Sequence, residues 1–263
     1  MARAARDELT DTAADAAIDQ ACRILRLPTI RDRHGEVAAA ASRQQASYKG
    51  FLVELLSIEC DDREQRRKAR LVREAGFPRP KRIEDFDYAA NPNVPAALIH
   101  TLAKGAWVAA GQPCCLIGDS GTGKSHLLIA LGTAAAENGY RVKYTTAAAL
   151  VNELVEAADD KTLSRTIARY GRLDLLCLDE LGYLELDRRG AELLFQVFTE
   201  REERASIAIA SNAAFSEWTS TFTDPRLCAA IVDRLTFDAH IITTGTDSYR
   251  LRTAQARHQA ART

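Results

Sequence analysis

The stretch GDSGTGKS, Gly118 to Ser125, decides the fold of this chain. It fits the pattern G-x-x-x-x-G-K-[ST], in which glycines let the backbone turn tightly and direct N–H groups at phosphate oxygens. The apolar run PCCLIG (113–118) leads into it, and HLLIALGTAAAENG (126–139) follows with helical periodicity. Because a phosphate-binding loop needs a strand before it and a helix after it, this context favours nucleotide binding over a chance glycine-rich turn.

The residues of this loop have distinct expected roles. We expect Lys124 to reach the β- and γ-phosphates and the Ser125 hydroxyl to ligate Mg²⁺, while the N-terminus of the helix faces the anion. The cofactors would then be ATP and Mg²⁺. The expected nucleotide-binding set is Gly118, Asp119, Ser120, Gly121, Thr122, Gly123, Lys124, Ser125 and His126.

Outward from the loop, apolar strands alternate with helical segments. The expected strands are 113–118, 141–146, 174–180, 206–212 and 240–244. The expected helices between them are 126–139, 147–172 in one or two pieces, 188–204 and 224–235. Five apolar strands that alternate with helices predict an α/β domain, with a parallel sheet covered on both faces.

The first part of the chain has a different pattern. Residues 1 to about 75 have helical periodicity, and the glycine and two prolines between 76 and 80 mark its end. We therefore predict a small all-α N-terminal domain over 1–75, a nucleotide-binding domain over 76–250 and a basic C-terminal tail over 251–263.

Composition excludes several classes of protein. The net charge of −1 gives no general attraction to polyanions, so any nucleic-acid surface must come from local clusters of charge. No apolar stretch approaches the ~18 residues of a membrane span, and the N-terminus lacks the apolar region of a signal peptide. The six cysteines form no C-x-x-C pair and are predicted to be reduced thiols. We expect a cytoplasmic protein without a membrane partner.

The strand at 174–180 ends in two adjacent carboxylates, within LLCLDELGYL (175–184). We expect Asp179 to hold the metal ion. Glu180 is predicted to point elsewhere, because neighbouring strand positions alternate sides, and to orient and polarise a water molecule beside the γ-phosphate. A small-molecule kinase must exclude attacking water, so this pair favours hydrolysis. The alternative is that Glu180 is only a solvated loop residue.

Three further polar residues are candidates for sensing or completing the site. Asn212, or its neighbour Ser211, ends the next strand, where a polar side chain can sense the γ-phosphate or position the same water. Arg234 is predicted either to pair with Asp233 or Asp238 or to act as an arginine finger on the ATP of a neighbouring subunit, where such a finger is worth ~10³–10⁵ in rate. Arg250 is a candidate second arginine on the phosphate of its own subunit.

Four of the stretches described above resemble, in order, the motifs of the IstB-like AAA+ ATPases. They are CCLIGDSGTGKSHLLIALG, DLLCLDELGYL, IAIASN and LCAAIVDRLTFDAHIITTGTDSYR, and the match covers roughly residues 75 to 252. These ATPases are the ATP-binding helper proteins of bacterial insertion sequences, and they are related to the DnaC-type helicase loaders.

The resemblance implies an AAA+ P-loop core whose five parallel strands are ordered 5-1-4-3-2. It also implies an ATP-dependent homo-oligomer on double-stranded DNA that recruits and stimulates a partner transposase and guides target selection. Carried over by position, Asp179 and Glu180 are the metal and water carboxylates, and Asn212 is the first sensor. Arg234 is the finger in trans, and Arg250 is a second sensor.

Two basic stretches could touch DNA. The predicted contacts in REQRRKARLVRE are Arg63, Arg66, Arg67, Arg70 and Arg73, which fall on one broad helical face. The predicted contacts in KTLSRTIARYGR are Lys161, Arg165, Arg169 and Arg172, which recur as one helical stripe. A solvated charged face is the alternative. For the first stretch the resemblance favours DNA, because the family's N-terminal helical domain is implicated in oligomerisation and duplex contact. For the second, a helical insertion at this place faces the central groove in AAA+ relatives that handle DNA. Contact to phosphates predicts weak sequence preference.

Three other functions compete with a transposition helper. A helicase loader built on the same ATPase module differs mainly in the N-terminal domain that meets the partner. A small-molecule kinase predicts no response to DNA. A scaffold that binds ATP without hydrolysing it is disfavoured by intact Lys124, Glu180 and Arg234.

Overall fold

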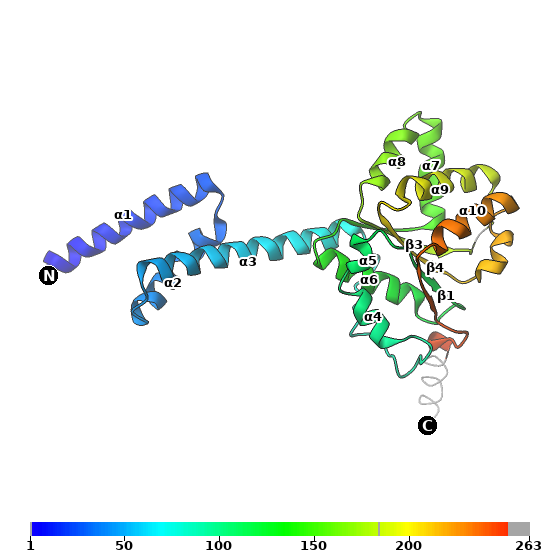
Figure 1. Ribbon diagram of the computed structural model, residues 1–263. Coiled ribbons are helices and arrows are strands. Elements are labelled where there is room, and N and C mark those ends of the chain that lie inside the picture. The colour runs from blue at the N-terminus through cyan, green and yellow to red at the C-terminus, as the bar shows by residue number, and fades with distance from the viewer. Residues whose placement is uncertain (1, 184, 252–263) are drawn as a thin grey trace, which may run out of the picture. The chain divides into compact units, whose positions relative to one another are not determined.

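A five-stranded parallel sheet lies at the centre of the part of the chain that follows residue 67 (Figure 1). Its strands are β1 (Cys114–Ile117), β2 (Val142–Thr146), β3 (Leu175–Leu181), β4 (Ser206–Ser211) and β5 (His240–Thr243). They lie in the order β2-β3-β4-β1-β5, and every pairing is parallel. Read from the other edge, this is the order 5-1-4-3-2 that the family resemblance implies, so the predicted AAA+ core is confirmed.

The computed structural model describes residues 2–183 and 185–251, with side chains from residue 12 onward. It divides into two compact units, Met1–Arg67 and Lys68–Thr263, which are considered separately. Of the basic tail predicted over 251–263, only Leu251 lies within the described residues.

Helices cover both faces of the sheet, as the sequence predicts. On one face lie α4 (Ala96–Leu102), α5 (Ala106–Ala109) and α6 (Lys124–Glu137); on the other lie α7 (Ala147–Asp159), α8 (Leu163–Gly171), α9 (Arg188–Arg201) and α10 (Pro225–Thr236). Strand alternation sends Cys114 and Leu116 into the first core and Cys115 and Ile117 into the second. Neighbouring residues of β1 therefore anchor opposite layers, which fixes the strand that leads into the phosphate loop.

Local capping explains where several of these helices begin. Thr146 accepts a hydrogen bond from the Ala149 N–H at the start of α7, and Asp187 accepts one from the Gly190 N–H at the start of α9. Helix α10 begins with Asp224 as its cap and Pro225 at its first position. Helices α4 and α5 and the 3₁₀ helix η1 (Phe215–Ser220) lie in segments for which the sequence predicts no element.

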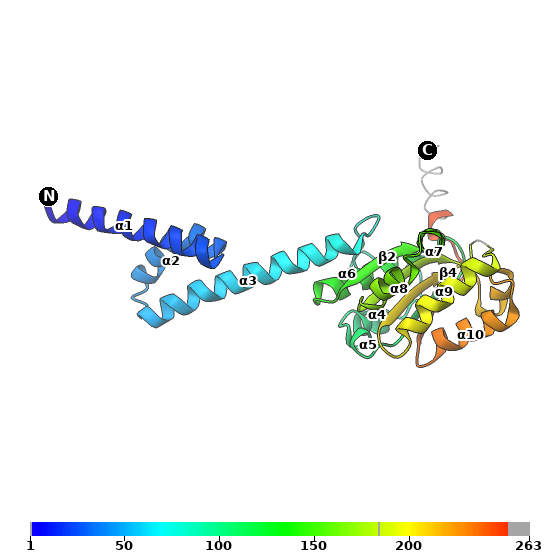
Figure 2. The ribbon, with the colours of Figure 1, turned by 90° about the horizontal axis from the view of Figure 1, so that it is seen from above.

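The first unit is all-α in its described residues, as predicted, with short turns between its helices. It contains α1 (Ala2–Leu25), α2 (Pro28–Arg43) and the first part of α3 (Tyr48–Ala75), which Figure 2 shows from a second direction. Helix α3 ends where the sequence predicts, at Ala75 before Gly76 with φ of 74°. The division between the units falls inside α3, because Leu71 and Ala75 pack into the core of the sheet domain. No helix in the described part of the chain is long and apolar enough to cross a membrane.

All six cysteines are free. Five of them are buried, as expected for core thiols, and only Cys60 is exposed. Burial raises the pKa of Cys114 to about 12, so this thiol is protonated and unreactive at neutral pH.

Candidate nucleotide-binding site

The phosphate loop turns between β1 and α6 on glycines that no other residue can replace without movement. Gly121 and Gly123 lie in the left-handed region, with φ of 85° and 100°. A Cβ atom added to Gly123 would lie 2.6 Å from a ring carbon of Phe86, and one added to Gly121 would lie 2.2 Å from the Ser248 hydroxyl oxygen. The loop is therefore both strained for L-residues and enclosed by two distant segments of the chain.

Those distant segments hold the loop by hydrogen bonds. The buried Asn91 amide donates to the carbonyl oxygens of Thr122 and Thr244, each at 2.9 Å. The hydroxyls of the same two threonines lie 2.6 Å apart, and the Tyr249 N–H donates to the Gly121 carbonyl. Asn91 and Thr244 were not predicted from the sequence. No local pattern reveals them, because each acts on residues far away along the chain.

The predicted metal pair is brought together. The Ser125 Oγ atom donates to Asp179 Oδ1 at 3.1 Å, and the Asp179 side chain is only 4% exposed. A hydroxyl and a carboxylate at the end of a phosphate loop are the hard oxygen donors that Mg²⁺ prefers. These residues fit a magnesium ion bound with nucleotide phosphates, and Ser125 and Asp179 are the residues that would hold it.

Glu180 reaches the site for a reason different from the one predicted. Leu178 pairs with Ile209, whereas Leu181 pairs with Ser211, so β3 carries one extra residue in a bulge. Glu180 lies in this bulge with a left-handed φ of 60°, which costs on the order of 1–3 kcal/mol for a residue other than glycine. Regular alternation does not apply here, and both carboxylates line the same cavity. The expectation that strand alternation separates them is wrong.

This cavity has a volume of about 490 Å³ and collects most of the predicted site. Its lining includes every loop residue from Ser120 to His126, together with Asp179, Glu180, Asn212 and Arg250. It also includes residues that the sequence did not single out, namely Arg79, Lys81, Asp85, Phe86, Asp87, Asn91 and Tyr249. The segment 79–91 carries no recognisable binding motif, so only its position reveals its part in the site.

The polar groups of the cavity suit a polyphosphate. Burial lowers the pKa of Lys124, an effect opposed by the charges of Asp179 and Asp119, and its ammonium donates to the Asp119 carbonyl at 2.6 Å. Arg250 also lines the cavity, so the predicted second arginine lies beside the loop of its own chain. The Asn212 Oδ1 atom is buried without a hydrogen-bond partner among the described residues. An unsatisfied buried acceptor is costly, and a ligand water or a protonated group would satisfy it.

Arg234 lies away from this cavity. Helix α10 connects two parallel strands, so its C-terminal end lies near the N-terminal ends of the strands, whereas the phosphate loop lies at their C-terminal ends. The Arg234 Nε atom donates to Glu202 at 2.8 Å, and the guanidinium lies 4.4 Å from the centroid of the Phe195 ring. From the sequence, Asp233 or Asp238 is the predicted alternative ion-pair partner of Arg234. The structure shows Glu202 as the partner instead. Arg234 cannot reach the nucleotide site of its own chain.

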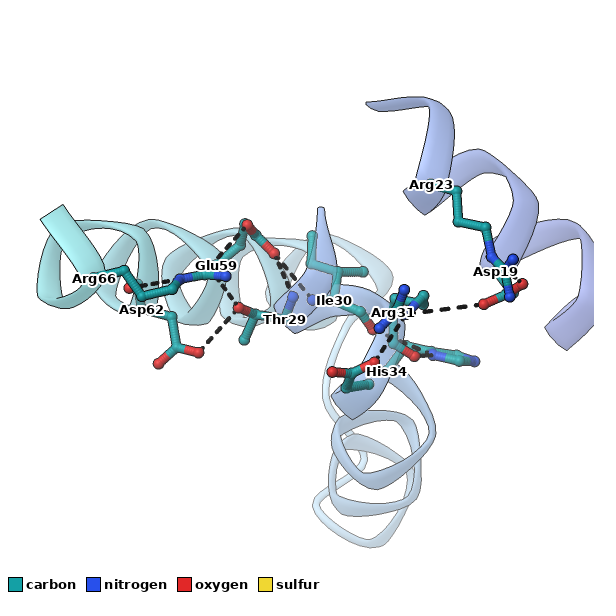
Figure 3. Close-up of polar contacts among 10 residues, drawn as sticks. Asp19, Arg23, Thr29, Ile30, Arg31, His34, Glu59, Asp62 and Arg66 are labelled. Atoms are coloured by element: carbon teal, nitrogen blue, oxygen red, sulfur yellow. Dashed lines mark hydrogen bonds and ion pairs between the residues drawn. The ribbon is translucent and has the colours of Figure 1, made fainter. Parts of the chain in front are cut away.

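In the first unit, two of the predicted DNA-contacting arginines are engaged in holding α2 against α3, and Figure 3 shows one of them, Arg66, beside Glu59 and Thr29. The Glu59 carboxylate of α3, only 3% exposed, accepts hydrogen bonds from the Thr29 and Ile30 N–H groups at the start of α2. Arg63 lies 3.2 Å from this carboxylate, and Arg66 lies 3.5 Å from it and donates to the Thr29 hydroxyl. Arg63 and Arg66 are therefore structural partners of Glu59.

Replacing Glu59 with glutamine is expected to destabilise the first unit by about 2 kcal/mol. The change removes the charge that both arginines face, and the cost is below that of a fully buried pair because both arginines are half exposed. Urea unfolding followed by circular dichroism would measure it. Glu54→Gln, an exposed change on the same helix, is the control, and equal stability of the two variants would contradict the role given to Glu59.

The remaining arginines of α3 lie on its surface. Arg67 and Arg70 make weak pairs within the helix, with Glu64 and Glu74, each at 3.7 Å, and Arg73 is exposed. These three residues stay available for phosphate contact.

The second predicted stripe is only partly helical. Lys161 has a φ of 58° in the turn that ends α7, so it lies outside α8 and the prediction of a continuous stripe is wrong at this position. Arg165 and Arg169 lie in α8, and Arg172 follows at its C-cap. Arg169 pairs with Glu153 of α7, whereas Arg165 is exposed.

Comparison with known proteins identifies the family of the chain. The family described as IstB-like ATP binding protein matches residues 20–257. An insertion sequence ATP-binding protein of Sinorhizobium fredii is 39% identical over 231 residues, which are 88% of this chain and 78% of that relative. The ATP-binding protein of insertion sequence IS5376 from Geobacillus stearothermophilus is 34% identical over 235 residues, 89% of this chain and 94% of the relative.

Solved structures agree on the fold. The replication initiator DnaA bound to AMPPCP and single-stranded DNA has a TM-score of 0.56 at 22% identity, over 70% of this chain and 56% of that one. DnaI has a TM-score of 0.53 at 19% identity, over 66% of this chain and 93% of that one. The five-stranded parallel sheet agrees with the fold of these structures, and the phosphate loop agrees with an ATP-binding family. The chain belongs to the IstB-like ATP-binding proteins associated with insertion sequences and has an AAA+ fold.

Proposed function

We propose that the chain hydrolyses ATP with Mg²⁺ while assembled as a homo-oligomer on double-stranded DNA. In this role it would recruit and stimulate a partner transposase in the cytoplasm and guide the choice of target DNA, with hydrolysis as the switch. The observation that carries the proposal is the meeting of Ser125, Asp179, Glu180 and Asn212 around one cavity. A site that only stored ATP would not need a strained carboxylate beside the metal pair.

Each residue of the site has a chemical part in hydrolysis. Lys124 and the loop N–H groups would bind the phosphates, and Arg250 would add positive charge to the same cavity. Glu180 would accept a proton from the attacking water, while the side-chain amide of Asn212, which lines the same cavity, would hold that water in line. A bound Mg²⁺ would neutralise charge that develops on the phosphate oxygens.

The assembly would complete the site. Arg234 lies at the end of the sheet away from its own phosphate loop. Its guanidinium would therefore contact the nucleotide phosphates of a neighbouring subunit. DNA contact is proposed for Arg67, Arg70 and Arg73 on α3 and for Arg165 near α8, where exposed guanidinium groups can pair with phosphates.

Double-stranded DNA is expected to raise the ATPase rate and to convert small particles into larger assemblies when ATP is present. Hydrolysis measured by phosphate release and particle size measured by light scattering, each with and without duplex, would test this. Heparin is the control for simple polyanion binding. An unchanged rate and a monomer under all nucleotide conditions would overturn the proposal, and stimulation by a replicative helicase instead of a transposase would favour a loader.

A further inference from the structure

The Asp179 carboxylate has a third hydrogen-bond donor that lies outside the phosphate loop. Its Oδ1 atom accepts from Ser125 Oγ at 3.1 Å and from the Glu180 N–H at 2.9 Å. Its Oδ2 atom accepts from the hydroxyl of Tyr144 on β2 at 2.7 Å. Both carboxylate oxygens are therefore engaged, and the plane of the group is fixed.

Tyr144 is well placed to act as a permanent donor. It lies on the strand next to β3, where Tyr144 pairs with Cys177 and Thr146 pairs with Asp179. An ionised carboxylate can only accept hydrogen bonds, so the phenol hydroxyl of Tyr144 is the donor in its bond to Asp179. The bond thus cannot reverse its direction.

We propose that Tyr144 is a positioning residue for the metal site, an inference that rests on the proposed Mg²⁺-dependent function. By occupying Oδ2, the hydroxyl leaves Oδ1 as the oxygen that faces Ser125, where the metal and phosphates would bind. A carboxylate free to rotate would have to be ordered each time the metal–nucleotide complex enters. Partners that orient ligands in this way typically change metal affinity about 10–100-fold when removed.

Phe77 holds the tyrosine ring in place. The two ring centroids are 6.0 Å apart and the ring planes are tilted by 59°. Phe77 itself packs closely on α6, because a Cβ atom added to Gly132 would lie 2.9 Å from its ring. Since Phe77 comes directly after Gly76 at the end of α3, the chain that leaves α3 braces the donor of the metal carboxylate.

The test is Tyr144→Phe, which removes only the hydroxyl. The Mg²⁺ concentration that half-saturates binding of a fluorescent ATP analogue to the full chain is expected to rise about tenfold or more. Affinity for the analogue in EDTA is expected to stay within about twofold, because the phosphate loop is unchanged. Tyr140→Phe, the same change just before β2 at a hydroxyl that does not bond to Asp179, is the matched control.

Phe77→Leu gives a second, independent readout. If Phe77 acts through the tyrosine hydroxyl, the Phe77→Leu change should raise the half-saturating Mg²⁺ concentration in the wild-type background. The same change should add little in the Tyr144→Phe background. Equal half-saturating Mg²⁺ concentrations in Tyr144→Phe and wild type would overturn the inference alone. Fully additive effects of the two changes would overturn the role given to Phe77. If the wild-type chain binds nucleotide with an affinity that does not depend on Mg²⁺, that result would overturn the proposed function and the inference with it.

Discussion

Replacing Glu180 with glutamine is expected to lower ATP turnover about 10²–10⁴-fold while leaving ATP and DNA binding intact. The amide keeps the size of the side chain and its place in the cavity, but it cannot accept a proton from water. The nucleotide would remain as ATP, and an assembly that hydrolysis normally resolves would accumulate. Single-turnover hydrolysis, equilibrium binding of an ATP analogue and particle size after ATP addition would measure the three consequences separately.

Glu185→Gln is the matched control, because Glu185 is exposed five positions later and does not line the cavity. It should hydrolyse ATP at the wild-type rate. Normal turnover in Glu180→Gln would show that another group activates the water. Loss of ATP affinity together with turnover would mean that Glu180 supports binding, and the proposed division of roles with Asp179 would then be wrong.

The phosphate loop could be predicted from sequence because its chemistry is local. Glycines, Lys124 and Ser125 must follow one another within one turn of chain, so the pattern itself carries the function. The parallel sheet could be predicted for a similar reason, since its strands are short apolar runs separated by amphipathic helices. The start of α7 is also local, because the Thr146 side chain caps it, whereas α8 begins after Thr162 without a side-chain cap.

The contacts that tune the site could not be predicted, because they join residues far apart in the chain. Asn91 reaches both Thr122 and Thr244, and Tyr144 reaches Asp179, yet each looks in sequence like an ordinary loop or strand residue. The bulge at Glu180 is equally hidden. Two adjacent carboxylates suggest a metal and a water role, but only the register against β4 places both on one cavity.

In the basic stretch of α3, the sequence groups arginines that the structure separates. Its arginines share a helical face, so sequence alone treats them as one surface. The structure separates Arg63 and Arg66, which serve the buried Glu59, from Arg67 and Arg70, whose pairs are weak and exposed. We therefore expect removal of Arg67 or Arg70 to reduce the salt dependence of DNA binding more than removal of Arg63 or Arg66. Of these four guanidinium groups, only those of Arg67 and Arg70 can exchange a weak surface partner for phosphate.

Replacing Arg234 with alanine is expected to reduce turnover about 10³–10⁵-fold in the assembled state, with ATP affinity retained. The side chain is 24% exposed and is held by Glu202 and the Phe195 ring. It lies near the N-terminal ends of the strands, away from its own phosphate loop. Its effect on hydrolysis must therefore cross a subunit boundary. Turnover should be measured above and below the concentration at which assembly occurs, and the loss should appear only above it.

Mixing two inactive variants gives the sharper test. Arg234→Ala subunits keep Glu180, and Glu180→Gln subunits keep Arg234, so an interface between them contains one complete site. Mixed assemblies should recover turnover that neither variant shows alone, and Arg226→Ala, an exposed change at the start of the same helix, should be active without mixing. Absence of recovery in assemblies shown to contain both subunits would place Arg234 in a structural role with Glu202, because a finger acting in trans must complement.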